Sequence, residues 1–178
     1  MDKNLPNKLS MLRVLMVPVF MAVLLIWPGE SWAKWVGLAI FIIASLTDLL
    51  DGKIARKYNL VSDFGKFIDP LADKILVMAA LLVFIQWGTM PSWAVCIILT
   101  REFAVSGLRM IAASKGIVMA AAMSGKIKTA SSMVCICAML TPLGSIAAIN
   151  WVCTAIMVIT TVVSGTEYFA KNTDVLKG

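Results

Sequence analysis

The sequence predicts an all-α, polytopic membrane protein with six transmembrane helices and a short amphipathic N-terminal segment. Of the 178 residues, 60% are hydrophobic, and the mean hydropathy of +0.89 is too high for a soluble domain of this size. Short turns containing Gly and Pro, or short polar segments, separate the apolar runs. No polar linker divides the chain, so we expect one membrane domain covering residues 1–178.

The predicted elements follow one another closely along the chain. Residues 1–13 are basic and amphipathic, and the apolar run after them reaches Trp27. The next four spans are expected at about residues 32–57, 65–87, 92–115 and 125–140, and the sixth follows a turn at 141–144 and ends near Phe169. A cleaved secretory signal is the alternative for the N-terminus, but the first run is long enough to cross and further spans follow it.

The basic residues are distributed unevenly over the two sides of these spans. The formal net charge is +6, and Lys34 is the only basic residue assigned to an outside loop, which leaves 15 of the 16 Lys and Arg elsewhere. The positive-inside rule therefore places both termini in the cytosol and predicts a multi-pass protein of the cell membrane. Nucleic-acid binding is disfavoured for a chain this apolar.

Four aspartates lie close together in a sequence that contains only ten acidic residues. Asp48 and Asp51 are three residues apart, and Asp69 and Asp73 are four apart, so on helices each pair shares one face. Gly65 lies on the same stripe as Asp69, where a missing side chain leaves room for a ligand. The second span is apolar until Thr47, which predicts that its aspartates enter the cytoplasmic leaflet.

This carboxylate cluster predicts a site for divalent cations. Four facing carboxylates repel one another unless cations lie between them. Without His or a nearby Cys pair, they suit Mg²⁺ or Mn²⁺, and two such ions typically hold a phosphate chain during displacement. Arg56 adds a fork for phosphate oxygens, and Gly52 permits close backbone approach. The alternative is a set of solvated acids or a structural network of Asp with Lys and Arg.

The same residues carry a resemblance to a known family. The pattern D-x-x-D-G-x-x-A-R, eight residues, then G-x-x-x-D-x-x-x-D spans Asp48 to Asp73 with every specified position filled. It resembles the signature of the CDP-alcohol phosphotransferase family, whose members are membrane enzymes that displace CMP from a CDP-linked lipid with an alcohol. The resemblance covers nearly the whole chain and is most specific in the aspartate motif.

The resemblance implies roles for individual residues. Asp48, Asp51, Asp69 and Asp73 would hold two divalent ions, and Asp73 would also be the catalytic base. The positions that would contact the CDP-lipid are Asn7, Ser10, Gly52, Arg56, Ser62 and Gly65. For Asn7 and Ser10, ordinary helix capping is an equal alternative. The expected substrate is CDP-diacylglycerol among membrane lipids, the active site would face the cytosol, and a homodimer is implied by other members.

The acceptor is indicated by a second group of residues. T-R-E-F-A-V-S-G-L-R at 100–109 and G-K-I-K-T at 125–129 resemble the branch that uses glycerol 3-phosphate. Arg101, Arg109, Lys126 and Lys128 would supply the cations that a phosphate-bearing acceptor needs. Structural alternatives are an Arg101–Glu102 or Arg109–Asp pair, because charges inside a span usually have a partner, and lysines that only mark topology.

Other functions remain open at this point. Inositol phosphate would need the same cations, so charge alone does not separate it from glycerol 3-phosphate. A membrane prenyltransferase also uses two Asp-rich motifs with Mg²⁺, but in a much longer chain and without D-G-x-x-A-R. From another class, a cation transporter would use the carboxylates as an ion path. Metal-dependent release of CMP distinguishes the phosphotransferase from both.

Overall fold

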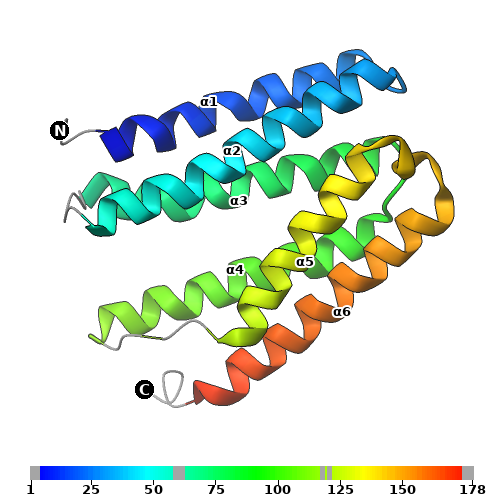
Figure 1. Ribbon diagram of the computed structural model, residues 1–178. Helices are drawn as coiled ribbons and strands as arrows, with labels where there is room; N and C mark the ends of the chain where they lie inside the picture. The colour runs from blue at the N-terminus through cyan, green and yellow to red at the C-terminus, as the bar shows by residue number, and fades with distance from the viewer. Residues whose placement is uncertain (1–4, 58–62, 117–118, 120–121, 174–178) are drawn as a thin grey trace. The chain divides into compact units, whose positions relative to one another are not determined.

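The computed structural model describes the backbone of residues 5–57, 63–116, 119 and 122–173, and the side chains of 11–47, 74–116, 119 and 122–173. Helices and short turns account for these ranges, and none of the described residues forms a strand, which confirms the all-α class (Figure 1). The elements are α1 (Leu5–Ile26), α2 (Ser31–Lys57), α3 (Asp63–Gln86), α4 (Ser92–Ser114), α5 (Met123–Leu140), the 3₁₀ turn η1 (Pro142–Ser145) and α6 (Ala147–Lys171).

The N-terminus differs from the sequence-based expectation. The amphipathic segment is not separate from the first apolar run, because α1 is one helix that begins at Leu5 and continues through Pro18. A continuous helix satisfies its backbone groups internally, as an apolar environment requires. One basic residue of this segment, Arg13, is buried, with only 1% of its surface exposed.

The helices α1, α2 and α3 form the first of two compact units, which comprises residues 1–87 and 140–142. The helix α1 packs along both α2 and α3. The ring centres of Phe20 in α1 and Phe41 in α2 lie 6.2 Å apart. A Cβ atom on Gly37 would come within 2.6 Å of Leu24 Cδ2, so α1 and α2 approach this closely because position 37 has no side chain. This unit contains both helices that carry the aspartate motif.

The second unit comprises residues 88–139 and 143–178. Its helices α4 and α6 pack against each other through buried apolar residues, among them Ile98, Leu108 and Met157. In the first turn of α6, the side chain of Asn150 donates a hydrogen bond of 2.9 Å to the carbonyl of Gly144 in η1. Gly144 itself lies against the carbonyl of Met139, where a Cβ atom would collide with backbone. This turn therefore fixes the entry into α6.

Each of the six tryptophans lies within five residues of a helix end, and all of these ends adjoin the same three connections. They adjoin the connections at residues 27–30, 87–91 and 141–146, and they are Trp27, Trp32, Trp35, Trp87, Trp93 and Trp151. The rings of Trp27 and Trp32 are 5.2 Å apart, and Lys34 Nζ lies 5.7 Å from the centre of the Trp87 ring. Tryptophan at helix ends is typical of the membrane–water interface.

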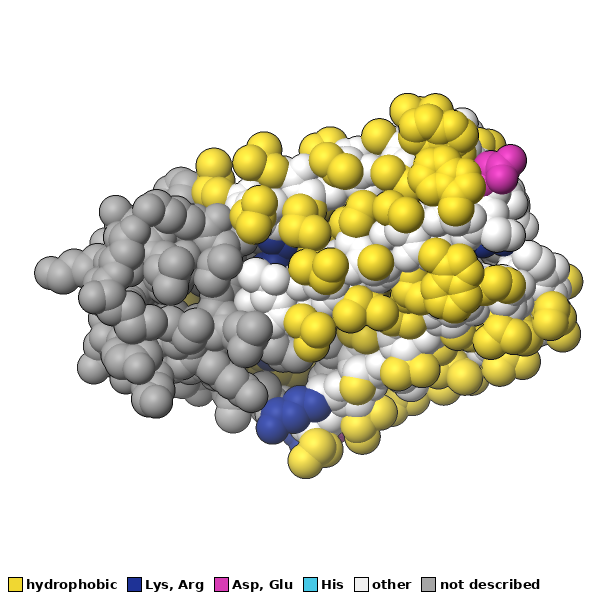
Figure 2. Space-filling view, turned by 45° about the horizontal axis from the view of Figure 1, so that its top comes forward, with side chains coloured by type: hydrophobic (Ala, Val, Ile, Leu, Met, Phe, Trp, Pro, Cys, Tyr) yellow, Lys and Arg dark blue, Asp and Glu magenta, His cyan; other side chains and the backbone are white. Residues whose placement is uncertain are grey.

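The described surface is strongly apolar. Hydrophobic side chains cover much of the face shown in Figure 2. Over the described surface as a whole, the exposed large hydrophobic residues include Leu15, Met110, Val134 and Ile159. Soluble monomers rarely expose apolar area on this scale. Within the described side chains, α6 is the one helix long and apolar enough to cross a membrane, and apolar stretches of 10–17 residues lie in α1, α2 and α3. The helical fold and this surface indicate a membrane-bound protein.

Candidate active site

The structure places both halves of the aspartate motif on helices. Asp48 and Asp51 lie in α2, and Asp69 and Asp73 lie in α3. Because the backbone is helical at both places, each pair shares one helix face, as the spacing predicted. The four side chains lie outside the described residues. Carboxylate oxygens are donors that Mg²⁺ and Mn²⁺ accept, so the chemistry of this set and its helical pairing fit a divalent-metal site.

The side chains of the residues predicted to contact the CDP-lipid also lie outside the described residues. Those with helical backbone but side chains outside the described residues are Asn7, Ser10, Gly52, Arg56 and Gly65. Ser62 lies outside the described residues altogether. Their assigned roles stay predictions.

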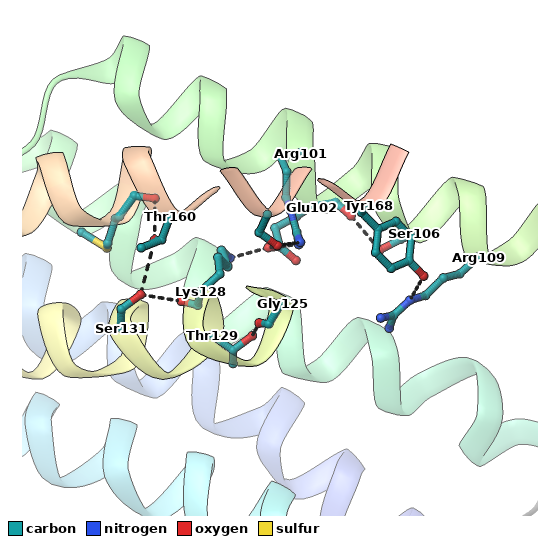
Figure 3. Close-up of polar contacts among 12 residues, drawn as sticks. Arg101, Glu102, Ser106, Arg109, Gly125, Lys128, Thr129, Ser131, Thr160 and Tyr168 are labelled. Carbon is teal, nitrogen blue, oxygen red and sulfur yellow. Dashed lines mark hydrogen bonds and ion pairs between the residues drawn. The ribbon is translucent and has the colours of Figure 1, made fainter. Parts of the chain in front are cut away.

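A second polar cluster lies within the other unit, and its side chains are among the described residues. Glu102 of α4 accepts hydrogen bonds from its neighbour Arg101, at 3.2 Å, and from Lys128 of α5 (Figure 3). Arg101 also donates to the hydroxyl of Ser164 on α6. The Lys128 side chain is 5% exposed and that of Glu102 is 20% exposed. The cluster therefore ties three helices together in an environment where isolated charges are costly.

These contacts bear on two of the predicted acceptor residues. The structure contains the Arg101–Glu102 pair that was the structural alternative, and it adds Lys128 to the same carboxylate. Among the described residues, these two cations and one anion sum to one net positive charge. Arg101 and Lys128 therefore have a structural role, and their contact with an acceptor phosphate stays a prediction.

The other two predicted acceptor residues have different surroundings. Arg109 of α4 donates a hydrogen bond of 2.9 Å from Nε to the hydroxyl of Tyr168 on α6, and its guanidinium carbon lies 5.3 Å from the centre of that ring. The predicted alternative of an aspartate partner stays a prediction, because every aspartate side chain lies outside the described residues. The Lys126 side chain is exposed and forms no ion pair or hydrogen bond with any described side chain. Among the described residues, no carboxylate forms an ion pair with Arg109 or Lys126.

The sequence analysis missed the contribution of α6. Ser164, Gly165 and Tyr168 are buried on the face that packs against α4. A Cβ atom on Gly165 would lie 3.0 Å from Arg101 Cγ, so the missing side chain makes room for that arginine. A signal was present, because small and polar residues recur every three or four positions in an otherwise apolar span. That pattern marks a helix face that packs against protein and not against lipid.

Comparison with known proteins gives a consistent result. The family model for CDP-alcohol phosphatidyltransferase matches residues 3–163. A Bacillus subtilis protein named CDP-diacylglycerol–glycerol-3-phosphate 3-phosphatidyltransferase is 45% identical over 194 aligned positions, which cover 98% of this chain and 97% of that protein. A Mycobacterium tuberculosis protein named probable phosphatidylglycerophosphate synthase is 40% identical, with 94% of this chain and 81% of that protein covered.

A further relative from Rickettsia prowazekii carries the same name as the Bacillus subtilis protein. It is 42% identical over 128 positions, which cover 72% of this chain and 70% of that protein. The family match extends over most of the chain and includes the aspartate motif and the α4 and α5 basic residues. The chain therefore belongs to the CDP-alcohol phosphatidyltransferase family.

Proposed function

We propose that this protein transfers the phosphatidyl group of CDP-diacylglycerol to sn-glycerol 3-phosphate, which gives phosphatidylglycerol phosphate and CMP. The observation that carries the proposal is the 45% identity to a protein of that printed activity over nearly the full length of both chains. The complete motif from Asp48 to Asp73 supports the reaction class. The basic residues of α4 and α5 support a phosphate-bearing acceptor.

The four aspartates have distinct proposed roles. Asp48, Asp51 and Asp69 would hold a pair of divalent ions, and Asp73 would complete the ligand set. When bound, Mg²⁺ or Mn²⁺ ions would neutralise phosphate charge and stabilise the departing CMP oxygen. Asp73 takes the proton from the acceptor hydroxyl as that oxygen attacks the lipid-side phosphorus. The hydroxyl displaces CMP directly, so no covalent enzyme intermediate is needed.

The remaining residues bind and orient the two substrates. Gly52, Arg56 and Ser62 bind the nucleotide and its phosphates, together with Asn7 and Ser10 of α1 and Gly65 of α3. For the acceptor phosphate we assign Arg109 and Lys126 the main role, because no described carboxylate neutralises them. Arg101 and Lys128 contribute the one net positive charge that remains beside Glu102.

The membrane arrangement is part of the proposal. Six helices cross the cell membrane, both termini face the cytosol, and the reaction takes place at the cytoplasmic interface. Two distributions support it. Of the 16 basic residues, Lys34 in the first turns of α2 is the only one near the helix ends assigned to the outside, and all six tryptophans adjoin those ends. The lipid tails of the substrate then stay in the bilayer while its headgroup reacts. The homodimer implied by the family resemblance stays a prediction.

The test of the reaction is an acceptor panel with purified protein in detergent or liposomes. CMP release from CDP-diacylglycerol is measured with sn-glycerol 3-phosphate, inositol phosphate, free glycerol and serine, each with Mg²⁺ present. We expect release only with sn-glycerol 3-phosphate, and phosphatidylglycerol phosphate as the lipid product. Equal use of glycerol or serine would overturn the phosphate-binding acceptor site, and preference for inositol phosphate would replace the acceptor.

The metal requirement has a separate test. Chelation with EDTA should abolish CMP release, and excess Mg²⁺ or Mn²⁺ should restore it, because the carboxylates cannot approach a diphosphate without cations. A matched control with excess Ca²⁺-loaded EDTA excludes an effect of the chelator itself. Full activity in EDTA would contradict the proposal that the aspartates bind metal ions.

A further inference from the structure

Tyr168 is held rigidly in the core of the second unit. Only 3% of its surface is exposed, and it belongs to a cluster whose other buried members are Val105, Leu108 and Ala112 of α4. Met119, Ala122 and Phe169 pack against the same cluster. Close packing restricts the orientation of a buried ring, so the packing of α6 on α4 limits where the Tyr168 hydroxyl can lie.

The hydroxyl contacts one edge of the Arg109 guanidinium. It accepts the 2.9 Å hydrogen bond from Nε and lies 3.9 Å from the sulfur of Met119. Arg109 is itself exposed, so without this contact its long side chain would sample several rotamers. Figure 3 shows the two side chains meeting from α4 and α6. The contact therefore orients a cation that is otherwise mobile.

Within the described part of the chain, the contact leaves the terminal amines of Arg109 without a hydrogen-bond acceptor. Nε is taken by Tyr168, and no described residue accepts a hydrogen bond from Nη1 or Nη2. These two amines lie in one plane and match the spacing of two oxygens of a phosphate group. Arg101 differs, because its Nη1 and Nη2 donate to Glu102 and Ser164.

We propose that Tyr168 is a positioning residue that orients the Arg109 guanidinium to receive the phosphate of the acceptor. The inference rests on the proposed function, since it deepens the role of Arg109 there. Tyr168 acts through Arg109 and does not itself touch the substrate. A purely structural role for the same hydrogen bond, which satisfies a buried hydroxyl, predicts an effect on stability alone.

Tyr168→Phe tests the inference because it removes the hydroxyl and keeps the ring in the cluster. We expect the KM for sn-glycerol 3-phosphate to rise about tenfold, as for the loss of one hydrogen bond to a charged group, with the KM for CDP-diacylglycerol unchanged. Thr154→Val is the matched control, because it removes another buried hydroxyl of α6, which donates a hydrogen bond to the carbonyl of Asn150. Thr154→Val should leave both KM values unchanged.

A double-mutant cycle shows whether the effect passes through Arg109. Tyr168→Phe in an Arg109→Gln background should give no further rise in the acceptor KM. An equal rise in both backgrounds would overturn the inference, as would a lowered melting temperature with an unchanged acceptor KM. Arg109→Lys is the second variant, since it keeps the charge but loses Nε and the paired terminal amines, and it should raise the acceptor KM at least as much as Tyr168→Phe.

The proposed reaction and the inference fail in different ways. If Arg109→Gln left the acceptor KM unchanged, the inference would be overturned, while CMP release dependent on sn-glycerol 3-phosphate would keep the reaction in place. If wild-type protein released no CMP with sn-glycerol 3-phosphate, the proposed function would fail first. A third outcome is a raised acceptor KM in Arg109→Gln but an unchanged one in Tyr168→Phe or Arg109→Lys. That outcome would overturn the positioning role of Tyr168 and leave the proposed reaction in place.

Discussion

Lys128 of α5 and Glu102 of α4 form an ion pair that is largely shielded from solvent, although 26 residues separate them in the sequence. The same carboxylate also accepts a hydrogen bond from Arg101. A buried pair contributes modestly to stability while both partners are present, because desolvation offsets much of the attraction. Removing one partner leaves a charge buried alone, and that is strongly destabilising.

Glu102→Gln should therefore destabilise the protein by about 3 kcal/mol, since Lys128 stays buried without its carboxylate. Melting can be followed with a thiol-reactive dye, because Cys135 and Cys153 are buried in the folded chain. Glu167→Gln is the control. Its pair with Lys171 is exposed at the end of α6, so the melting temperature should hardly change. Similar shifts for both variants would contradict the structural role of Glu102.

The two lysines of α5 should separate binding from stability. Lys126→Gln should raise the KM for sn-glycerol 3-phosphate roughly ten- to hundredfold, the effect of about 1.5–3 kcal/mol for one charge-assisted contact, with normal melting. Lys128→Gln should lower the melting temperature, because Glu102 loses its partner on α5. Both parameters are measured on the same preparations. An unchanged acceptor KM in Lys126→Gln would contradict a role in phosphate binding and support the alternative that Lys126 only sets the membrane topology.

The aspartates should be unequal under substitution. Asp73→Asn should lower turnover about a hundredfold or more while much CDP-lipid binding survives, because it removes the base and one metal contact. Asp48→Asn or Asp69→Asn should weaken metal and nucleotide binding together. Turnover and CDP-diacylglycerol binding are measured for each variant. Near-normal turnover in Asp73→Asn would assign the base to another residue.

Two helical glycines offer a matched test of whether the space beside the Arg101 side chain affects acceptor binding. Gly165→Ala places a Cβ atom 3.0 Å from Arg101 Cγ, whereas Gly107→Ala meets nothing within 4 Å. We expect Gly165→Ala to displace Arg101 and raise the acceptor KM a few-fold. Gly107→Ala should leave the kinetics alone and stabilise α4 by up to about 1 kcal/mol through helix propensity. Identical kinetics for both variants would show that Arg101 tolerates the shift or lies away from the acceptor.

Topology is testable apart from chemistry. In a background without the four native cysteines, Asn59→Cys should react with an impermeant thiol reagent only after the membrane is opened. Glu30→Cys, at the exposed turn between α1 and α2, should react in intact cells. Labelling is read on the isolated protein. The reverse pattern would invert the proposed orientation, and labelling of both sites in intact cells would contradict the six-span arrangement.

The sequence by itself determined the helices, the pairing of the aspartates along them and the family. These are local properties. A 3.6-residue period decides which residues share a face, so Asp69 and Asp73 share one without any knowledge of their neighbours. Apolar runs and turn residues located the helix ends to within a few positions, except at the N-terminus, where α1 begins at Leu5.

Only the tertiary structure decided which partner each charged side chain has. Arg101 lies beside Glu102 in sequence, but Lys128 joins that carboxylate, and Arg109 meets Tyr168 from 59 residues away. Such pairs depend on the register in which helices pack, which small residues such as Gly165 set by close approach. Periodicity along one helix contains no information on that register. The burial of a charge and its partner therefore follow from packing between helices.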